Sequence, residues 1–178
     1  MSSQLSTTNK SNLKVYISLG SNQESASGTA LETLKLALVD LQAMSIAPLV
    51  KSSFYQTQPV DCAPGTAEFI NSAAKLELPV DCDPVDLLQS LHGIEAKFGR
   101  DRDGNSNAPR PLDLDLIYIS AIQLDTSELV LPHPRAHERL FVLLPLAEIE
   151  PDLELLPGQP SVTELISGLP DGPWVRKL

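Results

Sequence analysis

The sequence predicts one α+β domain of the split βαβ type, in which two helices cover one face of an antiparallel sheet. Two observations predict this fold. Segments with strand composition and segments with helical period follow the order strand, helix, strand, strand, helix, strand. The chain has 178 residues, a length that suits a single compact domain with most of its apolar surface buried. We therefore expect one domain over residues 13–178, preceded by a disordered polar tail over residues 1–12.

The first four elements are predicted from the spacing of apolar residues. Residues 13–20 (LKVYISLG) alternate and end at a glycine, which predicts a strand. Residues 28–43 carry leucines at helical spacing and predict an amphipathic helix. Residues 48–57 and 69–78 predict the next two strands, separated by a loop rich in proline.

The remaining elements follow from the second half of the chain. Residues 84–98 begin with proline in the first turn and place Val85, Leu88, Leu91 and Ile94 on one face, which predicts the second helix. A strand over 112–119 completes the split βαβ, or ferredoxin-like, plan. After it we expect a C-terminal extension that covers the other face of the sheet. This extension comprises a short hairpin, a helix bent near its proline, a weaker helix and a loose C-terminus, with the first three over 122–131, 135–149 and 161–168.

The strand LDLDLIYI (112–119) begins with two carboxylates, although strands disfavour aspartate. Asp113 and Asp115 are expected to share one face with Ile117 and Ile119, about 7 Å apart from each other. Both faces beyond the aspartates are apolar, so we expect an inner strand. The paired carboxylates suit Mg²⁺, which prefers oxygen ligands and shares them with phosphates. Alternatively, they cap the preceding loop or pair with Arg110, and the D-x-D pattern alone favours this alternative.

The positive charge of the chain is concentrated in one region. The formal net charge is -10 and the pI is about 4.6, which argues against a general nucleic-acid or anionic-membrane surface. Arginine suits bidentate phosphate recognition, so its concentration within residues 100–139 favours a phosphate pocket over scattered surface ion pairs. Beside such a pocket, the metal interpretation of the two aspartates becomes the better one. Five of the six arginines lie in this range: Arg100, Arg102, Arg110, Arg135 and Arg139.

The loop GRDRDGNSNAP (99–109) is glycine-rich, polar and longer than most connections. It has almost no apolar residue to pack, so we expect it to be mobile. A mobile loop carrying Arg100 and Arg102 would close over bound phosphates as a lid. The alternative is a simple connection between a helix and a strand.

Several segments together resemble one known family. APRPLDLDLIYI resembles the signature of the 6-hydroxymethyl-7,8-dihydropterin pyrophosphokinases, and five further segments match in the family's order between about residues 14 and 157. These segments are VYISLGSNQ, SSFYQTQPV, FINSAAKLE, IEAKFGR and LPHPRAHERLFVLLPLAEIEPDL. The resemblance implies transfer of pyrophosphate from ATP to the hydroxymethyl group of the pterin, with release of AMP and two Mg²⁺ ions, in folate biosynthesis.

The resemblance also implies roles for individual residues. Asp113 and Asp115 would bind both metals and, with Arg100 and Arg110, form the catalytic set. The pterin would stack between Phe69 and Phe141, hydrogen-bond to Asn71 and meet backbone groups around Thr57 and Val60. The residues implied to bind ATP are Glu95, Arg100, Arg102, Arg110, Leu116, His133 and Arg139. The chain departs from some members at Asn107, His92 and Phe69, where they carry tryptophan, glutamine and tyrosine.

The remaining expectations concern partners and location. We expect a cytoplasmic monomer that acts on two small molecules, ATP and the pterin, without nucleic acid or membrane, because no apolar run approaches membrane-spanning length and the N-terminus lacks the apolar core of a secretory signal. Cys62 and Cys82 are expected to be free thiols. Two other function classes remain open. They are a non-catalytic nucleotide- or pterin-binding module, and a metal-dependent nuclease, which the acidic charge disfavours.

Overall fold

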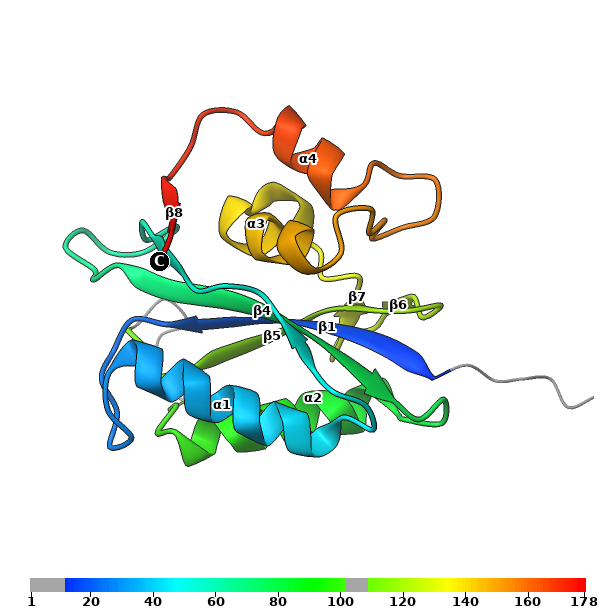
Figure 1. The fold of residues 1–178 in the computed structure, drawn as a ribbon, viewed down its shortest axis with the longest axis horizontal. Coiled ribbons are helices and arrows are strands. Elements are labelled where there is room, and N and C mark those ends of the chain that lie inside the picture. Colours follow the sequence, from blue (N-terminus) through cyan, green and yellow to red (C-terminus); the bar gives the residue numbers. More distant parts are fainter. Residues whose placement is uncertain (1–11, 102–108) are drawn as a thin grey trace, which may run out of the picture.

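The computed structural model describes residues 12–101 and 109–178. Most of the predicted tail, and the part of the predicted lid that contains Arg102 and Asn107, therefore lie outside the described residues. An antiparallel sheet in the order β5-β1-β4-β3-β8, with β2 beside β4, forms the centre of the molecule (Figure 1). Its strands are β1 (Leu13–Ser21), β2 (Val50–Lys51), β3 (Tyr55–Thr57), β4 (Phe69–Leu78), β5 (Asp113–Ile119) and β8 (Val175–Lys177).

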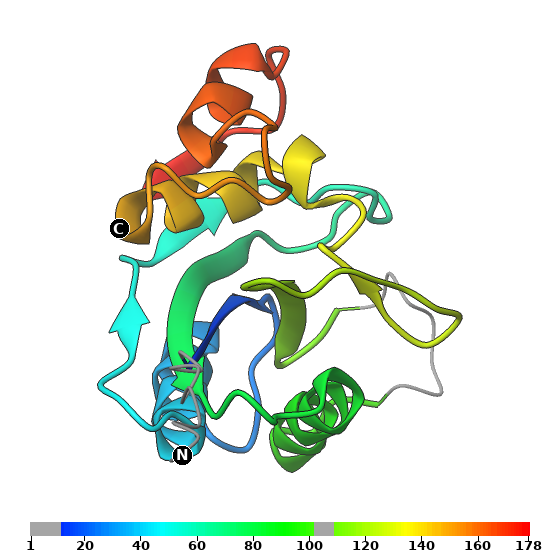
Figure 2. The same ribbon diagram turned by 90° about the vertical axis from the view of Figure 1, so that its right-hand side faces the viewer.

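Helices lie on both faces of this sheet. Helices α1 (Ala30–Met44) and α2 (Pro84–Lys97) cover one face, and α3 (Leu140–Ile149) and α4 (Val162–Gly168) lie on the other (Figures 1 and 2). A 3₁₀ turn (Ala136–Glu138) precedes α3. The predicted short hairpin is present as β6 (Leu124–Asp125) and β7 (Val130–Leu131). The α+β class with an antiparallel sheet is thus confirmed. None of the helices within the described ranges has the length and hydrophobicity that a membrane crossing requires.

Each face of the sheet has its own apolar core, because successive strand side chains point to opposite sides. Ile17 of β1 packs in the cluster that includes Leu34 of α1 and Leu91 of α2. Tyr16, its neighbour, packs in the other cluster with Leu143 of α3. The site described below lies on the second face, the one that α3 covers.

A short polar side chain caps the N-terminal end of each of the helices α1 and α2. Thr29 accepts a hydrogen bond from the backbone N–H of Glu32, whose carboxylate accepts one from the backbone N–H of Thr29, so α1 begins with a capping box. The Asp83 side chain caps the N-terminus of α2. Pro84 follows it and suits this position, because a backbone N–H in the first turn would have no partner within the helix.

The buried row of α2 differs from the predicted one. Leu87, Leu91 and Glu95 are its fully buried residues, whereas Val85, predicted for the core face, is only partly buried. The prediction considered apolar residues alone. It therefore missed that a carboxylate occupies one position of the buried row.

Strand β5 departs from the prediction in two respects. It is the last strand of the ladder on its side and not an inner strand, although a hydrogen bond of 2.8 Å from the His133 N–H to the Ile117 carbonyl protects its outer edge. The pairing with β1 shifts register so that Ile117 has no partner, which is a β-bulge. Ile117 therefore packs on the α3 side, but Ile119 packs on the α1–α2 side.

Three further segments differ from their predictions. The single strand expected over 48–57 is divided into β2 and β3. The helix expected from residue 135 begins at Leu140, because Arg139 has an extended backbone between the 3₁₀ turn and α3. The C-terminus is not loose, since β8 pairs with β3 at the edge of the sheet.

Candidate active site

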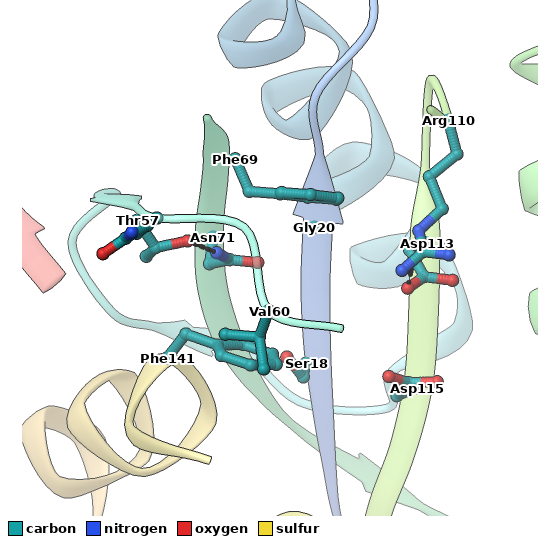
Figure 3. A pocket seen from close by; sticks show the side chains of 11 residues that line it. Ser18, Gly20, Thr57, Val60, Phe69, Asn71, Arg110, Asp113, Asp115 and Phe141 are labelled. Atoms are coloured by element: carbon teal, nitrogen blue, oxygen red, sulfur yellow. Dashed lines mark hydrogen bonds and ion pairs between the residues drawn. The ribbon is translucent and has the colours of Figure 1, made fainter. Parts of the chain in front are cut away.

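A cavity opens on the α3 face, where four neighbouring strands each contribute side chains (Figure 3). The register of the sheet produces this arrangement. Gly20 of β1 pairs with Asp113 of β5 on one side and with Asn71 of β4 on the other, so the three residues form a row across the sheet. The lining residues are Ser18, Gly20, Thr57, Gln58, Val60, Phe69, Asn71, Arg110, Asp113, Asp115 and Phe141.

Gly20 keeps the middle of this row open. A Cβ atom at this position would lie 2.8 Å from Asn71 Oδ1, closer than such atoms approach, and 3.9 Å from the side chains of Asp113 and Phe69. The glycine therefore allows the amide of Asn71 to lie directly over β1. Sequence reasoning did not select Gly20, because its contribution is the absence of a side chain.

Aromatic and amide groups form one half of the cavity. Phe69 and Phe141 come from β4 and α3 and lie on different sides of Asn71 in Figure 3. Asn71 is buried, and its Nδ2 donates a hydrogen bond of 2.7 Å to Thr57 Oγ1. This bond fixes the plane of the amide, which offers its oxygen and its second N–H to a ligand.

The cavity is small in this structure. Its volume is about 40 Å³, compared with the ~10–15 Å³ that one ordered water requires.

Charged groups form the other half of the cavity. Arg100 Nη1 lies 3.2 Å from Asp113 Oδ1, and Arg110 Nε lies 3.1 Å from Asp113 Oδ2. The pairing with Arg110, which the sequence offered as an alternative to metal binding, is thus present. The guanidinium of Arg110 also lies over the Phe69 ring, 5.5 Å from its centre, so it joins the charged half to the aromatic half.

Arg100 is not on a free part of the predicted lid. Its backbone N–H donates to the Glu95 carbonyl at the end of α2, and its side chain is largely buried against Asp113. The sequence-based expectation that Arg100 moves with the lid stays a prediction, and such movement would have to break these contacts. Arg102, the other arginine of that prediction, lies outside the described residues.

Asp115 differs from Asp113 in its surroundings. Its side chain makes no hydrogen bond or ion pair with another residue in the described ranges. Nor do those ranges contain a cluster of three or more His, Cys, Asp or Glu side chains that could hold a metal. Mg²⁺ binds through one or two carboxylates, waters and substrate phosphates. The two aspartates therefore fit magnesium whose coordination a nucleotide completes.

A second, more open cavity of about 340 Å³ lies on the far side of Asp115. Asp115 lines both cavities, so a ligand in each would meet at this carboxylate. Leu116, predicted to contact nucleotide, lies in the wall. The complete lining is Leu88, His92, Leu114, Asp115, Leu116, Glu128, Leu129, Val130, His133 and Pro134.

His133 in this second cavity is neutral at physiological pH. Burial, followed by the positive charges of Arg139 and Arg135, lowers the pKa of His133 to about 4. The backbone N–H of Arg135 donates to His133 Nδ1 over 3.2 Å, so the ring proton resides on Nε2. His133 can thus donate one hydrogen bond to an anion without carrying a charge itself.

Arg139 and Glu95, which were also predicted to bind nucleotide, have different surroundings. The Arg139 guanidinium lies over the Phe141 ring at 5.5 Å, and it interacts electrostatically with Asp115 and Asp113. Glu95 is fully buried and lines neither cavity. Its Oε1 accepts a hydrogen bond of 2.8 Å from the backbone N–H of Leu114, the residue between the two aspartates.

Comparison with known proteins connects this geometry to a family. Residues 16–151 match the family described as 7,8-dihydro-6-hydroxymethylpterin-pyrophosphokinase (HPPK). The 2-amino-4-hydroxy-6-hydroxymethyldihydropteridine pyrophosphokinase of Bacillus subtilis is 38% identical over 135 residues, which are 75% of this chain and 76% of that one. The enzyme of the same name from Haemophilus influenzae is 34% identical over 165 residues, 92% of this chain and 98% of that one.

The solved structures agree at the level of the fold. The crystal structure of wild-type Plasmodium falciparum HPPK-DHPS with pteroate matches with a TM-score of 0.64 at 13% sequence identity. The match covers 88% of this chain and 44% of that chain, so this chain spans less than half of the Plasmodium protein. The family match over most of the chain and the two relatives above together lead to one conclusion: this chain belongs to the 7,8-dihydro-6-hydroxymethylpterin-pyrophosphokinase family.

Proposed function

We propose that this chain transfers the pyrophosphoryl group of ATP to the hydroxymethyl group of 6-hydroxymethyl-7,8-dihydropterin, giving the pterin diphosphate and AMP in folate biosynthesis. One observation carries the proposal. A single cavity combines an aromatic and amide half, suited to a flat heterocycle, with a carboxylate and arginine half, suited to phosphates and Mg²⁺. The names of the relatives in Bacillus subtilis and Haemophilus influenzae support the same reaction.

The aromatic half is the proposed pterin site. Phe69 and Phe141 stack on the two faces of the ring, since aromatic rings prefer such contacts. Asn71, held by Thr57, pairs with the donor and acceptor edge of the pterin. Backbone groups near Thr57 and Val60 complete its hydrogen bonds.

The second cavity is the proposed site for the nucleoside part of ATP. Leu116 contributes an apolar surface there, and Asp115 lines both this cavity and the pterin cavity. The triphosphate then lies along Arg100, Arg110, His133 and Arg139, with His133 donating from Nε2. Glu95 acts on this site through the backbone of Leu114 rather than by contact with ATP.

The reaction joins the pterin hydroxyl oxygen to the β-phosphorus of ATP and breaks the bond between that phosphorus and the oxygen retained by AMP. Transfer of this kind depends mainly on alignment and charge neutralisation. Arg100 and Arg110, now paired with Asp113, can move to the phosphate oxygens and leave both aspartates available to metal. Two Mg²⁺ ions held by Asp113 and Asp115 would neutralise the phosphates and promote deprotonation of the hydroxyl.

We further propose the ferredoxin-like split βαβ plan for the core of the chain, as a single domain and a monomer. The spatial order β5-β1-β4-β3 supports the plan. If β2 and β3 are counted as one interrupted strand, β1 is the first strand and β4 the third, and these two lie side by side at the centre. The C-terminal helices α3 and α4 would then be the extension over the open face (Figure 2).

The test is incubation of the protein with ATP, Mg²⁺ and 6-hydroxymethyl-7,8-dihydropterin, followed by separation of the nucleotides. We expect AMP in amounts equal to the pterin diphosphate, and no AMP when the pterin is omitted. The Asp115→Asn variant is the matched control. Formation of ADP, or of AMP without pterin, would contradict the proposal. Binding of both ligands without any turnover would indicate a non-catalytic module instead.

A further inference from the structure

Strand β3 forms one wall of the proposed pterin site but has only three residues. Its last residue, Thr57, fixes the amide of Asn71, and the following segment carries Val60 into the cavity. Such a short strand is stable only through its neighbours. On one side β3 pairs with β4, and on the other it pairs with the C-terminal strand β8.

The wall formed by β3 and the segment with Val60 can move, because a cavity lies on each side of it. Val60 and Phe141 line the pterin cavity and also a third cavity, of about 130 Å³, behind it. The far side of that cavity is formed by the C-terminal segment, including Leu169, Pro173 and Val175. Because this cavity leaves room beside Val60 and Phe141, their separation from Phe69 depends on how β3 and α3 are attached to each other.

Glu148 makes that attachment. Its Oε2 accepts hydrogen bonds from the Tyr55 hydroxyl (2.7 Å) and from the Ser53 N–H (3.1 Å). Its Oε1 accepts from the Ser53 hydroxyl (2.8 Å) and from Lys177 Nζ (3.0 Å). We call Glu148, Ser53, Tyr55 and Lys177 the Glu148 cluster. It joins α3 to β3, to the residues before β3 and to β8.

The carboxylate of this cluster is held in its charged form. Burial alone would raise the pKa of Glu148, but hydrogen bonds from Tyr55, Ser53 and Lys177 outweigh it and lower the pKa to about 2. Glu148 therefore remains ionised throughout the neutral range, where its bonds to Tyr55 and Lys177 are charge-assisted.

Glu148 lies about two helical turns after Phe141 on the same helix, so displacement at one position is transmitted along α3 to the other. We propose that Glu148 is a positioning residue for pterin binding, which sets the distance between Phe141 on α3 and the Thr57–Asn71 pair on the sheet. Glu148 does not line the cavities beside Phe141 and would not touch the substrate. This inference depends on the pterin site proposed above.

The test compares Glu148→Ala and Glu148→Gln with a control on the same helix end. Glu150→Gln is the control, since Glu150 bonds to Lys75 (2.7 Å) and Tyr16 (3.2 Å), away from β3. For each variant, kcat, the two KM values and the Kd values for pterin and ATP are measured. Denaturant unfolding provides the stability of each variant and shows that it is folded under assay conditions.

We expect Glu148→Ala to raise the Kd for pterin about tenfold, the effect of roughly one charge-assisted hydrogen bond. The Kd for ATP should change less than about twofold, within the ordinary effect of a remote substitution. Glu148→Gln keeps one acceptor oxygen and should give an intermediate loss, and Glu150→Gln should leave pterin affinity unchanged. If Glu148→Ala does not fold, Tyr55→Phe, which removes a single bond of the cluster, is expected to reduce pterin affinity selectively.

Two outcomes would overturn the inference. They are equal losses for pterin and ATP, and unchanged pterin affinity in a folded Glu148 variant. Phe141→Ala separates this failure from failure of the proposed function. If the wild type forms AMP and Phe141→Ala loses pterin affinity but the Glu148 variants do not, only the positioning role is wrong. If the wild type forms no AMP from ATP and pterin, the proposed function itself is wrong.

Discussion

Asp113 and Asp115 lie two residues apart on the same strand face, yet their partners differ. Asp113 lies between two guanidinium groups, whereas Asp115 has no ion pair within the described parts of the chain. The difference arises from position. Asp113 is the first residue of β5, close to Arg100 and Arg110, and Asp115 lies two residue pairs further into the sheet, opposite Ser18.

The first prediction follows from this difference. Asp113→Asn and Asp115→Asn should each lower kcat about 100-fold or more, as expected when preorganised charge is lost from a phosphoryl-transfer site. Only Asp113→Asn should also change stability, because it removes the negative charge that Arg100 and Arg110 both contact at this position. Steady-state kinetics over a Mg²⁺ titration and urea unfolding measure the two effects. A near-normal rate for either variant at saturating Mg²⁺ would refute the metal assignment.

A second prediction concerns Gly20. In Gly20→Ala the new methyl group would meet Asn71 Oδ1 at 2.8 Å, so the amide must turn or shift and its bond to Thr57 is disturbed. We expect pterin affinity to fall about tenfold, the effect of roughly one hydrogen bond, with ATP affinity unchanged. Isothermal titration with each ligand gives both values. Ser18→Ala, also in β1 and also lining the cavity, adds no atoms and serves as the control. Unaltered pterin binding in Gly20→Ala would mean that Asn71 does not hold the ligand.

At the scale of elements, α2 and β5 share an apolar core, and a buried carboxylate also joins them. Glu95 accepts the N–H of Leu114, the residue that separates the two aspartates along β5. A buried N–H without a partner costs about 1–3 kcal/mol. The position of α2 and the position of the aspartates are therefore coupled.

The third prediction tests this coupling. Glu95→Leu should destabilise the protein by about 1–3 kcal/mol through the unpaired Leu114 N–H. It should also lower kcat, because the aspartates shift with the strand. Glu95→Gln retains an acceptor for Leu114 and should preserve most of both properties. Urea unfolding and kinetics on the two variants decide the matter. Equal kcat values for Glu95→Leu and wild type would show that the aspartates do not depend on α2.

The same contact shows where sequence-based prediction succeeds and where it fails. The leucines of α1 and the apolar run of β4 predicted those elements closely, because burial of one face produces a regular pattern. In α2 the pattern misled, since the buried row includes Glu95, and a charged residue marks a buried position only when its distant partner is known. The bulge at Ile117 is equally invisible, because it depends on pairing with β1.

The candidate site was predictable to a similar extent. Phe69, Asn71, Phe141 and the two aspartates were expected from the resemblance, and the structure brings them into one cavity. Strand β8 was missed, because three residues carry no period and its pairing with β3 joins positions more than a hundred residues apart. Contacts of such long range require the fold itself.

At the scale of the whole molecule, charge is unevenly distributed. The chain has 23 acidic and 13 basic residues. Arg100, Arg110 and Arg139 nevertheless gather around the two cavities, where they neutralise Asp113 and would meet phosphates. An acidic protein gains little from general attraction to nucleotides, so nucleotide affinity must come from this region and from the metal.

This distribution predicts that nucleotide binding depends strongly on Mg²⁺. ATP without metal brings its negative charges beside Asp113 and Asp115, which repel them, whereas ATP with Mg²⁺ allows both carboxylates to act as ligands. At 100 times Kd, a non-hydrolysable ATP analogue with Mg²⁺ should stabilise the protein by about 2.7 kcal/mol and raise Tm by roughly 5–10 °C. Excess chelator should remove most of that shift, and Asp115→Asn, which loses a metal ligand, should show little difference with or without Mg²⁺. Differential scanning calorimetry measures each case. An equal Tm increase in wild type with and without Mg²⁺ would mean that the arginines alone bind the triphosphate and that the two aspartates have another role.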